Sequence, residues 1–328
     1  MDSLGLVLAR GIFFIVGAFC YALLNILSQL SKEPDGSYAY SMPTVVLSSE
    51  FVKLCLSLGF LRAEKGSVRA TLKTISSTSL VSWLLFALPA VLYAVNNNLD
   101  MLNNQYMDPA TESVLVQGKI LTTGVAWWLV FNKPMATRKW LALVLLFVGC
   151  CGAGWPSTAE SKEKSTFIEP FGVLLIALYV CISASAGVYN EWLYKNMGKA
   201  DSIHMCNIRI YVTGCLFCLV THFGVGEGSA LAPGFGGLFK GYNMYTWALV
   251  ATYSMMGLLL AQVMKLFDSI VKLFISGSSM YVSALLTVVI FGRWPSVLFL
   301  VSMALVTLAI LLYNLEYITL MGEVKKGD

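Results

Sequence analysis

The sequence predicts an all-α polytopic membrane protein with about ten transmembrane helices. Apolar residues make up 57% of the 328-residue chain and charged residues only 12%, whereas soluble domains carry about 25% charged residues. The charges gather in short clusters between apolar runs of roughly 20 residues, the length of a helix that crosses a bilayer. Together with the mean hydropathy of +0.73, this pattern argues against a soluble domain.

Each apolar run is long enough to cross the hydrocarbon core, and polar connections separate the runs. The first run lacks a small-residue cleavage site, so we expect the first span there and no removed signal peptide. The predicted spans are 11–30, 42–61, 80–98, 110–131, 139–156, 171–192, 204–223, 244–265, 270–292 and 295–315.

Basic residues are distributed unevenly over the connections. An even number of spans puts both termini on one side, and the positive-inside rule makes the side with more Lys and Arg cytosolic. Twelve lie on the side of the termini, namely Arg10, Arg62, Lys65, Arg69, Lys73, Lys133, Arg138, Lys139, Lys195, Lys199, Lys325 and Lys326. Five lie on the other side, namely Lys32, Lys162, Lys164, Lys240 and Arg293. Both termini are therefore predicted to be cytosolic. No basic stripe stands out, so no nucleic-acid partner is expected.

A weak internal repeat relates the two halves of the chain by a shift of 160 residues. Five spans in each half give the second copy the opposite orientation, which is the inverted-repeat plan of many secondary transporters. We expect one membrane domain, in which the connection 157–170 joins a first half, 1–156, to a second half, 171–328. The aligned pairs are Asp108 with Asp268, Phe131 with Phe291, and Lys133 with Arg293.

Lys119 is the most informative charged residue within a predicted span. A lysine at bilayer depth costs roughly 2.5–3.5 kcal/mol, so it is tolerated mainly beside a partner or a water-filled cavity. Small or polar residues surround it in the sequence, as in a cavity wall. We predict that Lys119 binds a ligand; the alternative is a structural pair with Glu50, Glu112 or Glu191.

Three more charges interrupt the apolar stretch near the ninth span. On a helix, Lys265, Asp268 and Lys272 would lie on one face, and that face would offer a ligand two positive groups and one negative group. The alternative is a short cytosolic elbow whose charges are solvated. Lys272 could also extend to the interface.

Amides and tyrosines add further candidates. Tyr93 and the run Asn96-Asn97-Asn98 end the third span, where amides could read the edge of a base, or simply end a helix. Asn207 and Tyr211 share a face of the seventh span, whereas Arg209 does not and could pair with Glu191 or a lipid head group.

Glu50 and Lys53 lie one helical turn apart in the second span, so an internal ion pair and a direct ligand contact are equally open. The predicted spans thus carry a small positive excess together with amides and tyrosines. This combination suits an anionic solute with a ring that can stack, such as a nucleotide.

Five ordered motifs resemble the nucleotide-sugar transporters of the CMP-sialic acid and UDP-galactose branch, over roughly residues 40–315. The motifs are Tyr93-Ala-Val-Asn-Asn-Asn98, Asp108-Pro-Ala-Thr111, Gln117-Gly-Lys-Ile-Leu-Thr-Thr123, Gly187-Val-Tyr-Asn-Glu191 and Lys265-Leu-Phe-Asp-Ser-Ile-Val-Lys272. The resemblance implies the ten-helix drug/metabolite-transporter fold in the Golgi membrane. It also implies exchange of a nucleotide sugar for a nucleoside monophosphate by alternating access.

The same resemblance implies roles for individual residues. Lys119 and Lys272, one from each half, would hold phosphate, and an anion bridging them would lower the barrier between the two open states. Around the base and ribose would lie Tyr93, Asn96, Asn97, Asn207 and Tyr211, with Ser183, Gly187 and Tyr189 shaping the pocket opposite. Glu50, Lys53 and Lys265 are further candidates for ligand contact.

Several departures from the family pattern affect the choice of substrate. Gly118 replaces the usual Leu, Asn96 the usual Gln and Ser269 the usual Asn, and Met256-Gly257 lacks the family's double glycine. Glu112 stands where animal members tend to have Tyr, and its carboxylate could repel an acidic sugar. CMP is the favoured nucleotide, and a UDP-linked galactose or N-acetylglucosamine is the alternative.

Other classes of function fit the sequence less well. An enzyme would need a nucleophile, base or metal site, yet the chain has two histidines and no Cys/His cluster. A channel would show charged rings or a filter motif. The eight cysteines lie in or beside apolar runs, so no metal, cofactor or disulfide framework is expected. The terminal Lys325-Lys326 resembles a dilysine retrieval signal or is a solvated charge pair; the oligomeric state stays open.

Overall fold

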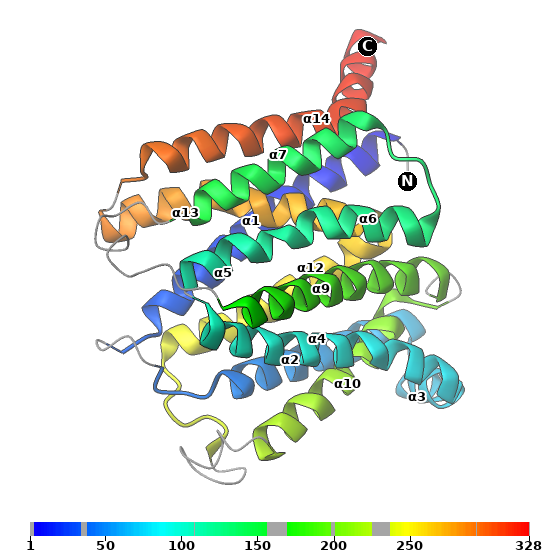
Figure 1. Cartoon of the computed structure of the whole chain (residues 1–328). Coiled ribbons are helices and arrows are strands. Elements are labelled where there is room, and N and C mark those ends of the chain that lie inside the picture. Colours follow the sequence, from blue (N-terminus) through cyan, green and yellow to red (C-terminus); the bar gives the residue numbers. More distant parts are fainter. Residues whose placement is uncertain are drawn as a thin grey trace. The chain divides into compact units, whose positions relative to one another are not determined.

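The computed structural model describes residues 3–33, 38–107, 109–155, 169–197, 201–224, 237–292 and 294–327. These residues form an all-α protein (Figure 1), as the sequence predicts. In chain order the helices are α1 (Ser3–Leu30), α2 (Met42–Lys65), α3 (Val68–Ser76), α4 (Leu80–Tyr106), α5 (Pro109–Leu115), the 3₁₀ turn η1 (Val116–Gly118), α6 (Lys119–Phe131), α7 (Thr137–Gly154), α9 (Pro170–Asn196), α10 (Ile203–Gly224), α12 (Met244–Leu266), α13 (Ser269–Phe291) and α14 (Val297–Gly327).

Within the described ranges, nine helices are long and apolar enough to cross a membrane by themselves. They correspond to nine of the ten predicted spans. The remaining prediction, 80–98, falls on α4. Its apolar part, Leu80–Tyr93, has the length and hydropathy of a membrane span only when it is taken together with α3. These two helices meet at 86°, so the count is nine, or ten if the bent pair is one span.

Local sequence signals end the helices near the predicted boundaries. Asn132 and Gly292 follow α6 and α13 in the left-handed conformation, with φ of 47° and 64°, which Asn and Gly adopt more readily than other residues. α12 begins with a capping box: the Asn243 side chain accepts from the Thr246 backbone N–H at 2.9 Å, and the Thr246 hydroxyl accepts from the Asn243 N–H at 3.3 Å. Each cap satisfies a backbone group that the helix leaves open.

The chain divides into two compact units that do not follow its two halves. Unit 1 contains Met1–Phe19, Val95–Val188 and Asp268–Asp328. In it α7 and α14 run antiparallel, with Gly149 facing Val306 and Gly152 facing Ser302. The backbones approach so closely that a Cβ on Gly149 would lie 2.6 Å from Val306 Cγ2 and 3.1 Å from the Ser302 carbonyl oxygen. Small residues commonly permit such contacts between helices in membranes.

Unit 2 contains Cys20–Ala94 and Tyr189–Phe267. Its α2 packs antiparallel to α10, where Phe60 meets the ring of His204 at 5.2 Å between centroids. α2 also packs against α12, where the Ser254 hydroxyl donates to the Ser49 carbonyl at 3.3 Å. The second span therefore contacts both the seventh and the eighth within one unit.

The 160-residue shift relates helices that belong to the same unit. It carries α2 onto α10 and α7 onto α14, and each of these pairs packs side by side. It also carries α6 onto the second half of α13, again within unit 1. Such pairing is what an inverted repeat would produce, and the repeat itself stays a prediction.

The crossing of α7 and α14 leads to a test of stability. We expect Gly149→Ala to lower the melting temperature in detergent, because overpacking a tight contact typically costs about 1–3 kcal/mol. The matched control is Gly59→Ala on α2, where an added Cβ meets no atom within 4 Å. Gly59→Ala should keep or raise the melting temperature. Equal effects of the two substitutions would contradict the close approach.

Candidate functional site

An ion pair of a buried lysine and a half-buried glutamate lies on α2 in unit 2. Lys53 Nζ is 2.5 Å from Glu50 Oε1, and Lys53 is only 8% exposed. The Lys53 ammonium also lies 4.7 Å from the centroid of the Tyr211 ring, in cation–π range. Of the two readings left open, the structure therefore contains the internal ion pair, and a ligand contact stays a prediction.

Two glycines make room for this pair. A Cβ on Gly257 of α12 would lie 2.5 Å from Lys53 Cδ, and one on Gly214 of α10 would lie 2.9 Å from Glu50 Oε2. Each charged side chain thus lies directly against the backbone of a neighbouring helix. This chain has Met256-Gly257 where the family has a double glycine, and Gly257 alone leaves room for the Lys53 side chain.

Polar groups from three helices surround the pair. The Tyr194 hydroxyl donates to Asn207 Oδ1 at 2.7 Å, and both residues are buried. Asn190 Nδ2 donates to the Tyr93 hydroxyl at 3.4 Å. Tyr194 also interacts electrostatically with Tyr93, Tyr211 and Glu50. We call this group the polar cluster; it consists of Glu50, Lys53, Tyr93, Asn190, Tyr194, Asn207 and Tyr211.

The sequence analysis missed Tyr194 and Asn190. Asn190 lies inside the motif Gly187–Glu191, so its position in that motif was an available signal. Tyr194 had no such signal, because an aromatic residue in an apolar run is normally a packing residue. Its role depends on the contact with Asn207, which lies 13 residues away on another helix.

Unit 1 holds both predicted phosphate-binding lysines. Lys119 begins α6 directly after the 3₁₀ turn, where Gly118 faces Val180 of α9. Lys119 interacts electrostatically with Cys150 of α7. The Cys150 sulfur lies 3.6 Å from the Cβ position of Gly277 on α13, the helix that carries Lys272. The two lysines therefore lie on helices α6 and α13, which pack against each other.

The expectation that Lys265, Asp268 and Lys272 share one helix face is wrong. α12 ends at Leu266 and α13 begins at Ser269, so the three residues do not share a helix. Asp268 is the N-cap of α13, where its Oδ1 accepts from the Val271 N–H at 2.7 Å. Aspartate is strongly favoured at the N-cap, the residue just before a helix begins. Asp268 therefore favours the start of a new helix over continuation of α12.

Lys265 lies near the first turn of α10, where it interacts electrostatically with His204 and Cys206. Cys206 directly precedes Asn207 of the polar cluster, so Lys265 belongs to the same end of unit 2, and a ligand contact for it stays a prediction. Tyr189 is engaged elsewhere: its hydroxyl donates to the Leu85 carbonyl at 3.2 Å, and its ring stacks on Trp192.

Three further predicted residues belong to unit 1. Asn96 is buried, and its Oδ1 has no hydrogen-bond partner among the residues that the structure describes. Gly187 is buried as well, yet a Cβ there would meet no atom of the described residues within 4 Å, so among them open space adjoins α9. Ser183 is half-buried one turn earlier on the same helix. The side chain of Asn97 lies outside the described residues.

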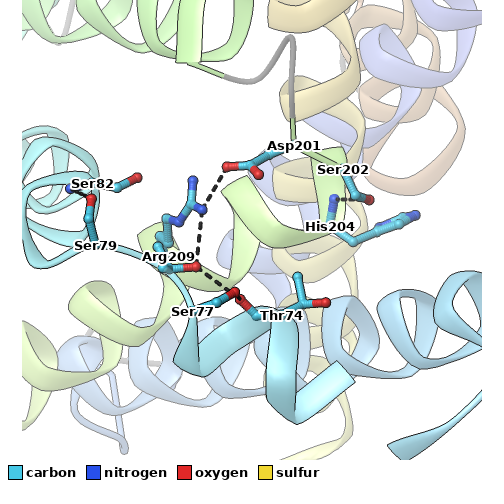
Figure 2. A network of polar contacts seen from close by, with 9 residues as sticks. Thr74, Ser77, Ser79, Ser82, Asp201, Ser202, His204 and Arg209 are labelled. Carbon is cyan, nitrogen blue, oxygen red and sulfur yellow. Dashed lines mark hydrogen bonds and ion pairs between the residues drawn. The ribbon is translucent and has the colours of Figure 1, made fainter. Parts of the chain in front are cut away.

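Arg209 pairs with Asp201, not with Glu191. Figure 2 shows Arg209 directed toward Asp201, and its Nη2 lies 2.7 Å from Asp201 Oδ2. The same Nη2 lies 3.4 Å from the Thr78 hydroxyl. Glu191 pairs instead with Lys195 at 2.6 Å. The sequence alone could not assign these partners. Glu191 could pair with Lys195, four positions away on the same helix, or with Arg209. Arg209 in turn could pair with Glu191 or with Asp201 in a loop.

Comparison with known proteins identifies the family. A family model described as nucleotide-sugar transporter matches residues 11–314. The chain belongs to the nucleotide-sugar transporter family. It is therefore a multi-pass membrane transporter and not an enzyme.

Relatives of this transporter are named for different substrates. A CMP-sialic acid transporter 1 of Oryza sativa subsp. japonica is 32% identical, covering 85% of this chain and 87% of the relative. A probable UDP-sugar transporter of Danio rerio is 33% identical over 84% of each chain. The UDP-N-acetylglucosamine transporter of Mus musculus is 31% identical, covering 88% of this chain and 89% of the relative.

A solved crystal structure supports the fold of the transporter. It aligns with a TM-score of 0.67 over 95% of this chain and 98% of that chain, at 12% sequence identity. At this identity the likeness concerns the fold alone.

The ion pair of the polar cluster leads to a second prediction. Glu50→Gln should destabilise the transporter by about 3 kcal/mol, because it leaves the Lys53 ammonium buried without its carboxylate. Glu50→Gln/Lys53→Met should recover most of that loss. Thermal unfolding in detergent measures both effects.

The matched control changes an exposed pair. Glu64 lies 3.6 Å from Lys65, and both are exposed. Glu64 also accepts a hydrogen bond from the Ser202 hydroxyl, which the amide oxygen of Gln can still accept, so Glu64→Gln should change stability by less than about 1 kcal/mol. A double variant as unstable as Glu50→Gln alone would show that charge pairing is not what holds the cluster.

Proposed function

We propose that this transporter exchanges a CMP-linked sugar, with CMP-sialic acid as the first candidate, for CMP by alternating access. The main support is the polar cluster, in which tyrosine rings and amides meet a buried cation. Rings can stack on a base, and amides can read its edge. Relatives from rice and from Arabidopsis thaliana named CMP-sialic acid transporter 1 agree with this choice.

In this proposal Lys119 and Lys272 hold the phosphate. Lys119 and Lys272 come from different halves of the sequence, yet both lie in this unit on helices that pack together. A phosphate held by both would connect the two sequence halves inside one unit. Charge-assisted hydrogen bonds of this kind are about twice as strong as neutral ones.

A UDP-linked sugar is the second candidate. Two observations favour it: relatives of similar identity are named UDP-sugar transporters, and Glu112 is a buried carboxylate at the start of α5. A buried negative charge near the ligand would disfavour the carboxylate of sialic acid.

Location and orientation complete the proposal. The positive-inside rule favours cytosolic termini, and the resemblance favours the Golgi membrane. The terminal Lys325-Lys326 would then face the cytosol, where a retrieval signal is read. Protection of a C-terminal tag from protease in sealed vesicles would contradict this orientation.

The first functional test is nucleotide binding. We expect CMP to raise the melting temperature of the purified transporter more than UMP, AMP or GMP. Lys119→Ala and Lys272→Ala should each weaken CMP binding roughly 10- to 150-fold, because each removes a charge-assisted bond to phosphate worth about 1.5–3 kcal/mol. A thermal-shift titration of each variant provides the measurement.

Lys133→Ala serves as the control for charge, since Lys133 is exposed in the connection between α6 and α7. It should bind CMP as the wild type does. A stronger response to UMP would select the second candidate, and no response to any nucleotide would refute the binding proposal.

The second functional test is exchange. In a low-dielectric interior the two lysines repel each other, and a bound phosphate neutralises them and lowers the barrier between the two open states. Proteoliposomes preloaded with CMP should therefore take up nucleotide sugar much faster than empty ones. Uptake by Lys119→Ala and Lys272→Ala should fall by the same factor as their affinity. Equal uptake into empty and preloaded vesicles would rule out obligatory exchange.

A further inference from the structure

α3 is a short amphipathic helix with an apolar stripe that no described residue covers. Val68 and Leu72, one turn apart, are 50% and 60% exposed. Arg69 and Lys73 form an adjacent, exposed basic stripe. Thr71 faces the protein and is buried. The helix therefore has an inner side, an outer apolar stripe and a basic edge.

The inner side fixes how α3 lies in unit 2. Ile75 packs on the apolar cluster that contains Leu61 of α2 and Met205 and Ile208 of α10. Ser67 caps the start of α3, where its hydroxyl accepts from the Ala70 N–H at 3.1 Å. Val68 and Leu72 thus lie beside this packed side and stay at least half exposed.

A second contact fixes the elbow between α3 and α4, residues 77–79. Arg209 is buried on α10 and pairs with Asp201 (Figure 2). It also donates to the Thr78 hydroxyl in this elbow. Its guanidinium carbon also lies 5.1 Å from the centroid of the Phe86 ring on α4. These contacts join the elbow, the first turns of α4 and α10.

The position of α3 in the chain places it at a membrane surface. The span on α2 ends at Lys65 and α4 begins at Leu80, so α3 connects two helices at one face of the bilayer. Its 86° angle to α4 lays it across the direction of the spans. Helices that bind membrane interfaces lie in this way, with the apolar side toward the acyl chains.

Charge indicates which lipids lie beneath it. Between residues 62 and 73 the exposed charges are Arg62, Lys65, Arg69 and Lys73 against a single acid, Glu64. We propose that α3 is an interfacial helix that binds anionic phospholipids: Val68 and Leu72 enter the upper acyl region, and Arg69 and Lys73 contact the head-group phosphates. Each basic residue near an anionic surface contributes about a fivefold preference.

The test measures lipid selectivity in nanodiscs. Wild-type transporter is placed in phosphatidylcholine nanodiscs with or without 30% phosphatidylserine, and native mass spectrometry counts the lipids that stay bound. We expect enrichment of phosphatidylserine and a higher melting temperature in the mixed nanodiscs. Arg69→Gln/Lys73→Gln should lower the preference for phosphatidylserine about 25-fold, about fivefold for each basic residue removed. Leu72→Ser should reduce the retention of both lipids.

Three controls make the outcome decisive. Lys133→Gln/Arg138→Gln removes the same charge from the connection between α6 and α7 and from the first turn of α7, and it should keep the preference. The melting temperature of Arg69→Gln/Lys73→Gln in pure phosphatidylcholine should equal that of the wild type, because both side chains are exposed. Inorganic phosphate at millimolar concentration should not displace phosphatidylserine.

Several results would overturn the proposal. One is an unchanged preference in Arg69→Gln/Lys73→Gln, and another is an equal loss in the control variant, which would indicate only general surface charge. Displacement by inorganic phosphate would indicate a site for free anions. If Leu72→Ser left lipid retention unchanged, the apolar stripe would belong to a protein partner instead.

Discussion

The hydrocarbon solvent is the constraint on which the rest of this structure depends. Because lipid offers no hydrogen bonds, the backbone must satisfy itself within helices, and charged side chains must find partners inside the protein. Lys53 accordingly pairs with Glu50, and Arg209 with Asp201. The first pair requires glycines on two neighbouring helices, so the need to neutralise one lysine also determines which residues α10 and α12 can carry at the contact.

The same constraint assigns different chemistry to the two units. Unit 2 holds an ion pair whose charges already compensate each other, surrounded by hydroxyl and amide groups that suit a neutral ring. Unit 1 holds two lysines on packed helices, together with the buried Asn96 and the open space beside Gly187. Each unit therefore carries its own kind of polar side chains within the spans, hydroxyls and amides beside the ion pair in unit 2 and lysines in unit 1.

The sequence alone predicted the fold well because hydropathy and helix caps are local signals. Nine predicted spans coincide with helices, and Asn132 and Gly292 end two of them as their conformational preferences suggest. Residues of the site were harder, since their partners are distant in sequence. Arg209 pairs with Asp201 across a loop, and Tyr194 acquires its role from Asn207 on another helix. The grouping of Lys265, Asp268 and Lys272 failed because one N-cap overrides periodicity.

The course of the chain between the two units has a mechanical consequence. It passes from one unit to the other at residues 19–20, 94–95, 188–189 and 267–268. Only the last passage lies between helices; the other three lie inside α1, α4 and α9, whose hydrogen-bonded turns continue through the junction. Reorientation of the units would therefore bend three continuous helices elastically, because no flexible linker is present at those points. The bending stiffness of α1, α4 and α9 would then limit how far the two units can turn.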